Sequence, residues 1–115
     1  MTKETKWSLI RIGTGDYAKG KTKPLYKEII DYSKKYRAVS ATVYKSIDGF
    51  LMKGSPEVVR LFGGVDKSQG IIIEVLIKSE QKNNFLEAVR DLAKSTNDPL
   101  IISVADSDIE VFGIE

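Results

Sequence analysis

The chain has 115 residues, with 42% hydrophobic and 30% charged residues, which is the composition of one ordinary globular domain. Its 18 basic and 16 acidic side chains leave a net charge of +2, too even a balance to indicate nucleic-acid binding. Cysteine and histidine are absent, which excludes disulfides, thiol or histidine catalysis and most zinc or copper sites.

The first half of the chain predicts a strand, a loop, a helix and a second strand. Residues 7–13 (WSLIRIG) alternate between two faces and predict a strand, and the glycine-containing residues 14–23 predict a loop. Residues 24–36 carry apolar side chains at helical spacing behind a proline, which predicts a helix. Residues 39–47 (VSATVYKSI) are rich in β-branched side chains and predict the second strand.

The second half repeats this order after a long connection. Residues 48–70 hold five glycines and no sustained period, so they predict a long loop. Residues 71–78 (IIIEVLIK) predict a central strand, and residues 80–95 a helix. Residues 100–104 predict a fourth strand, and residues 109–112 a short fifth one.

This order predicts an α+β fold, a ferredoxin-like βαββαβ sandwich with a long loop between strands 2 and 3 and a short C-terminal fifth strand. The whole of residues 1–115 is one domain, in which residues 1–6 are expected to be a flexible N-terminus. Two helices cover only one face of the sheet. Because apolar residues of the third and fourth strands remain on the other face, we expect an oligomer.

Several short motifs resemble the PII-like family of unknown function (domain of unknown function 190), related in fold to nitrogen-regulatory PII proteins. They are Lys19-Gly20, Pro24-Leu25-Tyr26, Ala41-Thr42-Val43 and Asp48-Gly49-Phe50. The ending SVADSDIEVFGIE also resembles that of PII proteins. The resemblance implies a regulatory homotrimer that binds a small effector, and it makes residues 48–70 comparable to the long loop through which PII proteins contact partners.

The chain also departs from the PII pattern. Leu51 stands where the family often has a further glycine, and Ser95-Thr96-Asn97-Asp98-Pro99 replaces a Gly-Asp-Gly-Lys turn. Residues 109–112 lack the arginines that hold nucleotide phosphates in PII proteins. The PII nucleotide site therefore cannot be transferred residue by residue.

The strongest candidate site is the basic turn ahead of the first helix, Lys19 to Lys23. Lys19, Gly20, Lys21 and Lys23 lie where a helix start offers free N–H groups, which favours phosphate or another anion. Gly49 and Phe50 are the other candidate ligand-binding residues. The alternative is a solvated basic loop. Residues 15–22 (GDYAKGKT) also fit the letters of a P-loop, although the chain is too short for a P-loop NTPase fold.

The long loop is the second candidate, as a surface for a partner protein. Lys53, Arg60 and Lys67 stand there among many apolar residues, which favours an arm that docks on a partner or folds over a ligand. The alternative is an ordered segment packed on a neighbouring subunit.

Other groups are weaker candidates. Asp98, Asp106 and Asp108 more often cap turns than bind a cation, so no metal site is predicted. Tyr17, Tyr26 and Tyr44 are candidates for stacking on an adenine ring, but Tyr26 and Tyr44 fit a core or interface better.

The sequence thus predicts a cytoplasmic PII-like regulatory protein, not an enzyme and with no cofactor. An adenine nucleotide is its expected effector, bound in clefts between subunits, and a transporter or channel its expected partner; both come from the resemblance. No nucleic acid is expected, and the chain is not expected to be an integral membrane protein, because it has no apolar run long enough to span a bilayer. The alternatives are a phosphate-processing enzyme using the Lys/Gly-rich turn and a purely structural oligomeric module.

Overall fold

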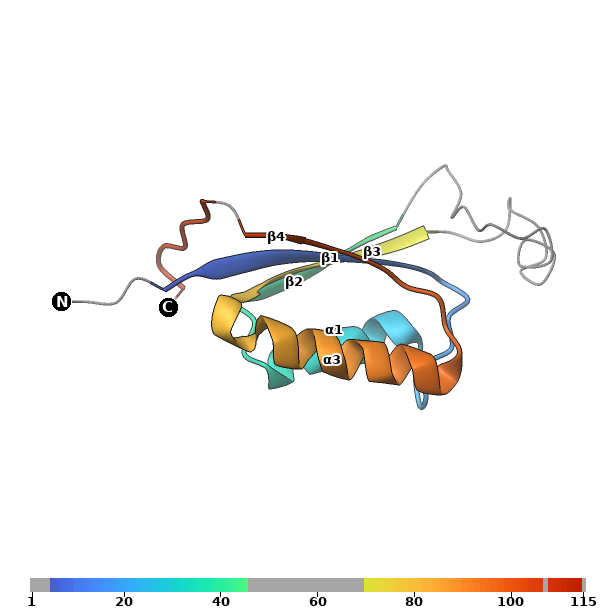
Figure 1. The fold of residues 1–115 in the computed structure, drawn as a ribbon. Coiled ribbons are helices and arrows are strands. Elements are labelled where there is room, and N and C mark those ends of the chain that lie inside the picture. Colours follow the sequence, from blue (N-terminus) through green and yellow to red (C-terminus); the bar gives the residue numbers. More distant parts are fainter. Residues whose placement is uncertain (1–4, 46–69, 107, 115) are drawn as a thin grey trace.

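The computed structural model describes residues 5–45, 70–106 and 108–114. It confirms the α+β, ferredoxin-like βαββαβ architecture. The elements are β1 (Trp7–Gly15), α1 (Leu25–Lys35), β2 (Ser40–Lys45), β3 (Gly70–Lys78), α3 (Ser79–Thr96) and β4 (Ile101–Ala105). The strands form one antiparallel sheet in the order β2-β3-β1-β4, and both helices lie on the same face of it (Figure 1).

The core lies between the sheet and the two helices. Alternate residues of β1 and β3 point toward the helices, because successive side chains of a strand face opposite sides. The fully buried strand residues are Ile10, Ile12, Ile71, Ile73, Val75 and Ile77. On α3 the buried positions Phe85, Leu86, Val89 and Leu92 follow helical spacing and complete the layer.

The opposite face of the sheet has no helix in the described part of the chain. It carries exposed apolar side chains, with Tyr44 50%, Ile72 46% and Ile101 52% exposed. These three and Gly13 form one row across the four strands. In the next row the Nε of Arg11 donates to Glu74 Oε2 at 2.9 Å. We call this surface the open face, and it matches the uncovered apolar face expected from the sequence.

The first strand is longer than the sequence predicts. β1 runs to Gly15 instead of ending at Gly13, because Thr14 and Gly15 pair with Ile71 and Gly70. Ladder pairing extends a strand through residues whose composition predicts a loop.

The predicted fifth strand at residues 109–112 is wrong for this structure, since residues 108–114 form no strand. A strand needs the N–H and C=O groups of a neighbour, and no described strand pairs with this segment. It instead returns toward the start of β1 (Figure 1), where Ile109 lines a groove beside Trp7. Phe112 remains 79% exposed.

The predicted flexible N-terminus at residues 1–6 lies mostly outside the described residues, which begin at Thr5. The long loop at residues 48–70 also lies outside them, apart from Gly70. Both remain predictions.

Candidate functional site

The basic turn joins the end of β1 to the start of α1. Gly20 has φ of +65°, and a Cβ there would lie 2.2 Å from the carbonyl oxygen of Lys23. Only glycine fits this left-handed position without displacing the backbone. The glycine of the predicted site is therefore needed for the shape of the turn.

The carboxylate of Glu28 closes the turn from within. Glu28 Oε1 accepts hydrogen bonds from the backbone N–H groups of Lys21 at 2.8 Å, Thr22 at 2.7 Å and Lys23 at 3.2 Å. The residue is only 7% exposed. Burial acts to raise the pKa of this carboxyl, but hydrogen bonds from the turn outweigh it and hold the pKa below its ordinary value.

A second carboxylate holds the first half of the turn. Asp98, two residues beyond the end of α3, accepts from the N–H of Lys19 at 3.3 Å and of Gly20 at 3.0 Å. The hydroxyl of Thr96 also donates to Asp98, at 2.6 Å. The five consecutive N–H groups of residues 19–23 therefore point at two carboxylates of the protein itself, and the turn is fixed to the ends of both helices.

This geometry differs from that of a P-loop. In a P-loop the backbone N–H groups cradle phosphate oxygens and a helix follows at once. Here the N–H groups of Lys21 and Thr22 donate to Glu28, and α1 begins at Leu25. The letters GDYAKGKT are present without the arrangement that gives them phosphate-binding power.

The lysine side chains of the turn are in different situations. Lys19 and Lys21 are exposed, and the described residues offer them no salt bridge. The ammonium group of Lys23 pairs with the carboxylate of Asp31, and its hydrogen bond lowers the pKa of Asp31. Lys19 and Lys21 are thus the cations of the turn that are available to an anion.

The turn lies at the end of the sheet from which residues 46–69 depart. Gly15 pairs with Gly70, and Lys45 pairs with Ile71, so the last residue before this segment and the first after it are at that end. The candidate residues Gly49, Phe50, Lys53, Arg60 and Lys67 belong to this segment and lie outside the described residues. Their roles remain predictions.

The three aspartates considered as cation ligands do not gather at one site, because Asp98 lies apart from Asp106 and Asp108, which line one groove beside Trp7. Asp98 holds the basic turn, whereas Asp106 lies at the other end of α3, accepting from the buried hydroxyl of Ser8 and from Lys82 Nζ at 3.1 Å. The hydrogen bond from Ser8, with that from Lys82, lowers the pKa of Asp106. Within the described ranges no group of three or more potential metal ligands occurs.

The tyrosines also separate. Tyr17 packs against the end of β1, where a Cβ on Gly15 would lie 2.0 Å from its ring. Burial, and secondarily Asp98 and Asp16, raises the pKa of Tyr17. Tyr26 packs partly buried against the core, as predicted, and Tyr44 lies on the open face.

The residues missed by sequence reasoning are the two carboxylates that shape the turn. Glu28 carried one signal, because an acid in the first turn of a helix often pairs with free N–H groups. The sequence gives no signal that Asp98 shapes the turn, because its partners, Lys19 and Gly20, are far away along the chain.

No helix in the described ranges has the length and apolarity needed to cross a bilayer.

Comparison with known proteins gives a family and a fold. The family model DUF190, described as "Uncharacterized ACR", matches residues 7–104. A search of curated proteins finds no match.

Two solved structures are similar to this chain. One is a candidate PII-like signalling protein from Thermus thermophilus, with 16% identity and a TM-score of 0.56, over 88% of this chain and 86% of that one. The other is a de novo designed protein, Foldit4, with 12% identity and a TM-score of 0.53, over 90% of this chain and 100% of that one. At such identities the likeness concerns the fold alone, and the designed protein illustrates that this fold does not imply a function.

Proposed function

This chain belongs to the DUF190 family, and from that premise we propose that it is a PII-like regulatory protein and not an enzyme. It binds a small anionic effector, an adenine nucleotide in the first instance, in clefts between the subunits of a cytoplasmic homotrimer. Residues 48–70 then report the bound state to a partner such as a transporter or channel.

The observation that carries the proposal is that the basic turn lies at the same end of the sheet as the two residues that flank residues 46–69. Lys45 and Gly70, which flank residues 46–69, are at the same end as Gly15, which leads into the turn. An anion held there by Lys19 and Lys21 would lie near both connections to the segment. Such an anion changes the conformation of residues 46–69 only if it binds two conformations of the protein with different affinity.

The rigid backbone of the turn supports side-chain recognition. Glu28 and Asp98 engage its N–H groups, so the turn is already ordered before a ligand arrives. Binding then costs little backbone entropy, which favours affinity. Lys19 and Lys21 would supply the positive charge, while Lys23 is already paired with Asp31.

The open face supports self-association. It exposes Tyr44, Ile72 and Ile101 in one row, which is an arrangement that a soluble monomer rarely leaves in water. A second copy of the same face offers apolar area of the same kind. Trimerisation itself is taken from the resemblance.

The test is calorimetric titration of the purified protein with ADP and ATP. Replacing Lys21 with Ala should weaken nucleotide binding about fivefold, since a contact to a charged group contributes on the order of 1 kcal/mol at a surface. Added salt should weaken it too. Lys27→Ala, an exposed lysine on α1 outside the turn, is the matched control and should leave affinity unchanged.

The outcomes separate the proposal from its rivals. Binding without release of inorganic phosphate supports a regulatory protein. Turnover of ATP would instead favour the phosphate-processing enzyme, and absence of any nucleotide binding would favour a purely structural module. Unchanged affinity in Lys21→Ala would remove the basic turn from the effector site.

A further inference from the structure

A cavity lies at the end of the sheet opposite the basic turn, where Trp7 of β1 pairs with Lys78 of β3. Its volume is about 340 Å³, within the range of small-molecule sites. The lining comes from β1, the α1–β2 connection, the end of β3 and the first turn of α3. It includes Trp7, Arg37, Val39, Lys78, Glu80 and Gln81.

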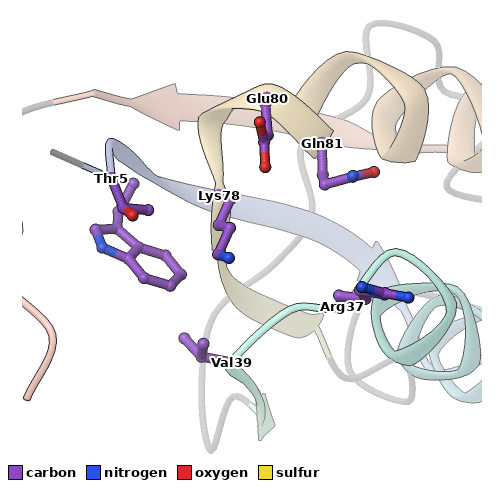
Figure 2. A pocket seen from close by; sticks show the side chains of 7 residues that line it. Thr5, Arg37, Val39, Lys78, Glu80 and Gln81 are labelled. Atoms are coloured by element: carbon purple, nitrogen blue, oxygen red, sulfur yellow. The ribbon is translucent and has the colours of Figure 1, made fainter. Parts of the chain in front are cut away.

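The cavity combines an apolar wall with two cations and one anion. Trp7, only 5% exposed, lines the cavity as an aromatic wall, and Val39 adds a second apolar side chain. Figure 2 shows Lys78 between Thr5 and Arg37, with Glu80 and Gln81 at the start of α3. No salt bridge joins Arg37, Lys78 or Glu80 to another residue within 5–45, 70–106 or 108–114.

Arg37 occupies a backbone position that usually belongs to glycine. Its φ is +62°, and it lies two residues beyond the end of α1. There the N–H of Ala38 donates to the carbonyl of Ser33 at 2.9 Å, and the N–H of Arg37 donates to the carbonyl of Lys34 at 3.1 Å. This is a Schellman ending, in which glycine is the residue of lowest conformational cost. A non-glycine residue held there suggests that its side chain is useful.

The end of α3 offers an internal comparison. There the N–H of Asp98 bonds to Ala93 at 2.9 Å, and Asn97 takes the left-handed position with φ of +57°. Asparagine is the commonest substitute for glycine at such positions, because its short polar side chain tolerates them. Arginine has no such local advantage. The charge that Arg37 brings to the cavity is therefore its distinguishing property.

We propose that this cavity binds a small aromatic monocarboxylate. The ring would lie against Trp7 and Val39, and the carboxylate would meet the ammonium of Lys78. Figure 2 shows the exposed side chain of Arg37 turned toward α1, so its guanidinium would swing inward to meet the same carboxylate. With Glu80 included, the three charged groups sum to one positive charge, which suits a single negative charge and disfavours a polyphosphate. The site is separate from the basic turn, and its existence does not depend on the proposed effector.

The test uses the intrinsic fluorescence of Trp7, the one tryptophan of the chain. Phenylacetate, titrated into the full-length protein under selective tryptophan excitation, should give a saturable change in intensity or emission wavelength. Phenylacetamide, which has the same ring without the charge, should bind about tenfold more weakly, the effect expected for losing a hydrogen bond to a charged group.

Two variants identify the cations. Arg37→Gly removes the guanidinium and suits the left-handed backbone, so the protein should fold and bind phenylacetate about tenfold more weakly. Asn97→Gly makes the same backbone change at the end of α3 and should bind normally. Lys78→Gln should weaken binding as Arg37→Gly does, and circular dichroism should show all three variants folded.

Several results would overturn the proposal. They are the absence of a saturable phenylacetate signal, equal binding of phenylacetamide, and normal binding by Arg37→Gly. If ADP bound more tightly than phenylacetate and lost affinity in Arg37→Gly, the monocarboxylate class would be wrong.

Discussion

The two faces of the sheet differ in burial and in the side chains that they carry. On the helix-covered face Ile71, Ile73, Val75 and Ile77 of β3 are completely buried. On the open face the intervening residues of the same strand are Ile72, Glu74, Leu76 and Lys78, a mixture of apolar and charged side chains. Successive side chains of this nine-residue strand therefore alternate between the buried core and the open face.

The covered face stabilises the fold, and the open face is available for contact with another molecule. The covered face supplies the core that makes the chain fold, since each buried isoleucine contributes on the order of 2 kcal/mol. The open face is not required for that core. Its apolar row and its Arg11–Glu74 pair are instead available for contact with another molecule.

The largest expected effect comes from the same substitution on adjacent residues of β3. Ile73→Lys should unfold the domain, because an unpaired charge in a fully buried site costs several kcal/mol against a total stability of about 5–15 kcal/mol. Ile72→Lys should remain folded, because its side chain is half exposed. Urea denaturation followed by circular dichroism measures the difference.

Sedimentation velocity on Ile72→Lys then tests the open face as an interface. We expect the native protein to associate and the variant to dissociate into folded monomers. A native protein that stays monomeric at micromolar concentration would refute the proposed trimer, and a folded Ile73→Lys variant would contradict the assignment of the covered face.

The next effect concerns Glu28, the buried carboxylate on the helix side of the sheet. Its folded pKa lies below its ordinary value of 4.5. The stability it contributes is therefore complete above pH 4.5 and is lost as the pH falls through the folded pKa. Glu28→Gln should cost about 1–2 kcal/mol at pH 7, by removing a charge-assisted acceptor.

Acid titration of the unfolding free energy checks this prediction. The difference between the native protein and Glu28→Gln should shrink as the pH is lowered below 4.5. Glu87→Gln, an exposed position on α3, is the matched control and should follow the native curve. A constant difference at all pH values would mean that the charge of Glu28 does not stabilise the turn.

The smallest effect on folding is expected at Arg11, where substitution tests whether a second copy covers the open face. Arg11→Met should change the stability of the isolated chain by less than about 1 kcal/mol, because its pair with Glu74 is solvent-accessible. If a second copy covers the open face, the same change leaves Glu74 unpaired in a dry interface and should weaken association much more.

A double-mutant cycle isolates this pair. Arg11→Met, Glu74→Gln and the double variant are compared by unfolding and by sedimentation. A coupling energy that appears in association but not in unfolding would support a covered open face. Equal coupling in both measurements would contradict it.

Most of the fold was predictable from the sequence, for local reasons. The alternation in WSLIRIG, the nearly continuous run IIIEVLIK and the helical spacing of Leu25 and Ile29 are properties of short segments. The same local reasoning placed a strand at residues 109–112, and it was wrong there because pairing is not a local property. The uncovered apolar face was also predictable, since it follows from the element order.

The candidate site was predictable only in part. The sequence by itself determined that Lys19, Gly20, Lys21 and Lys23 form a turn before a helix, and Gly20 has the positive φ that glycine favours. Only the tertiary structure decided that Glu28 and Asp98 engage the five N–H groups of that turn. It likewise brought Trp7, Arg37 and Lys78 to one cavity. Patterns along a chain report backbone preferences and burial, whereas hydrogen-bond partners and cavities depend on which distant segments the packed core brings together.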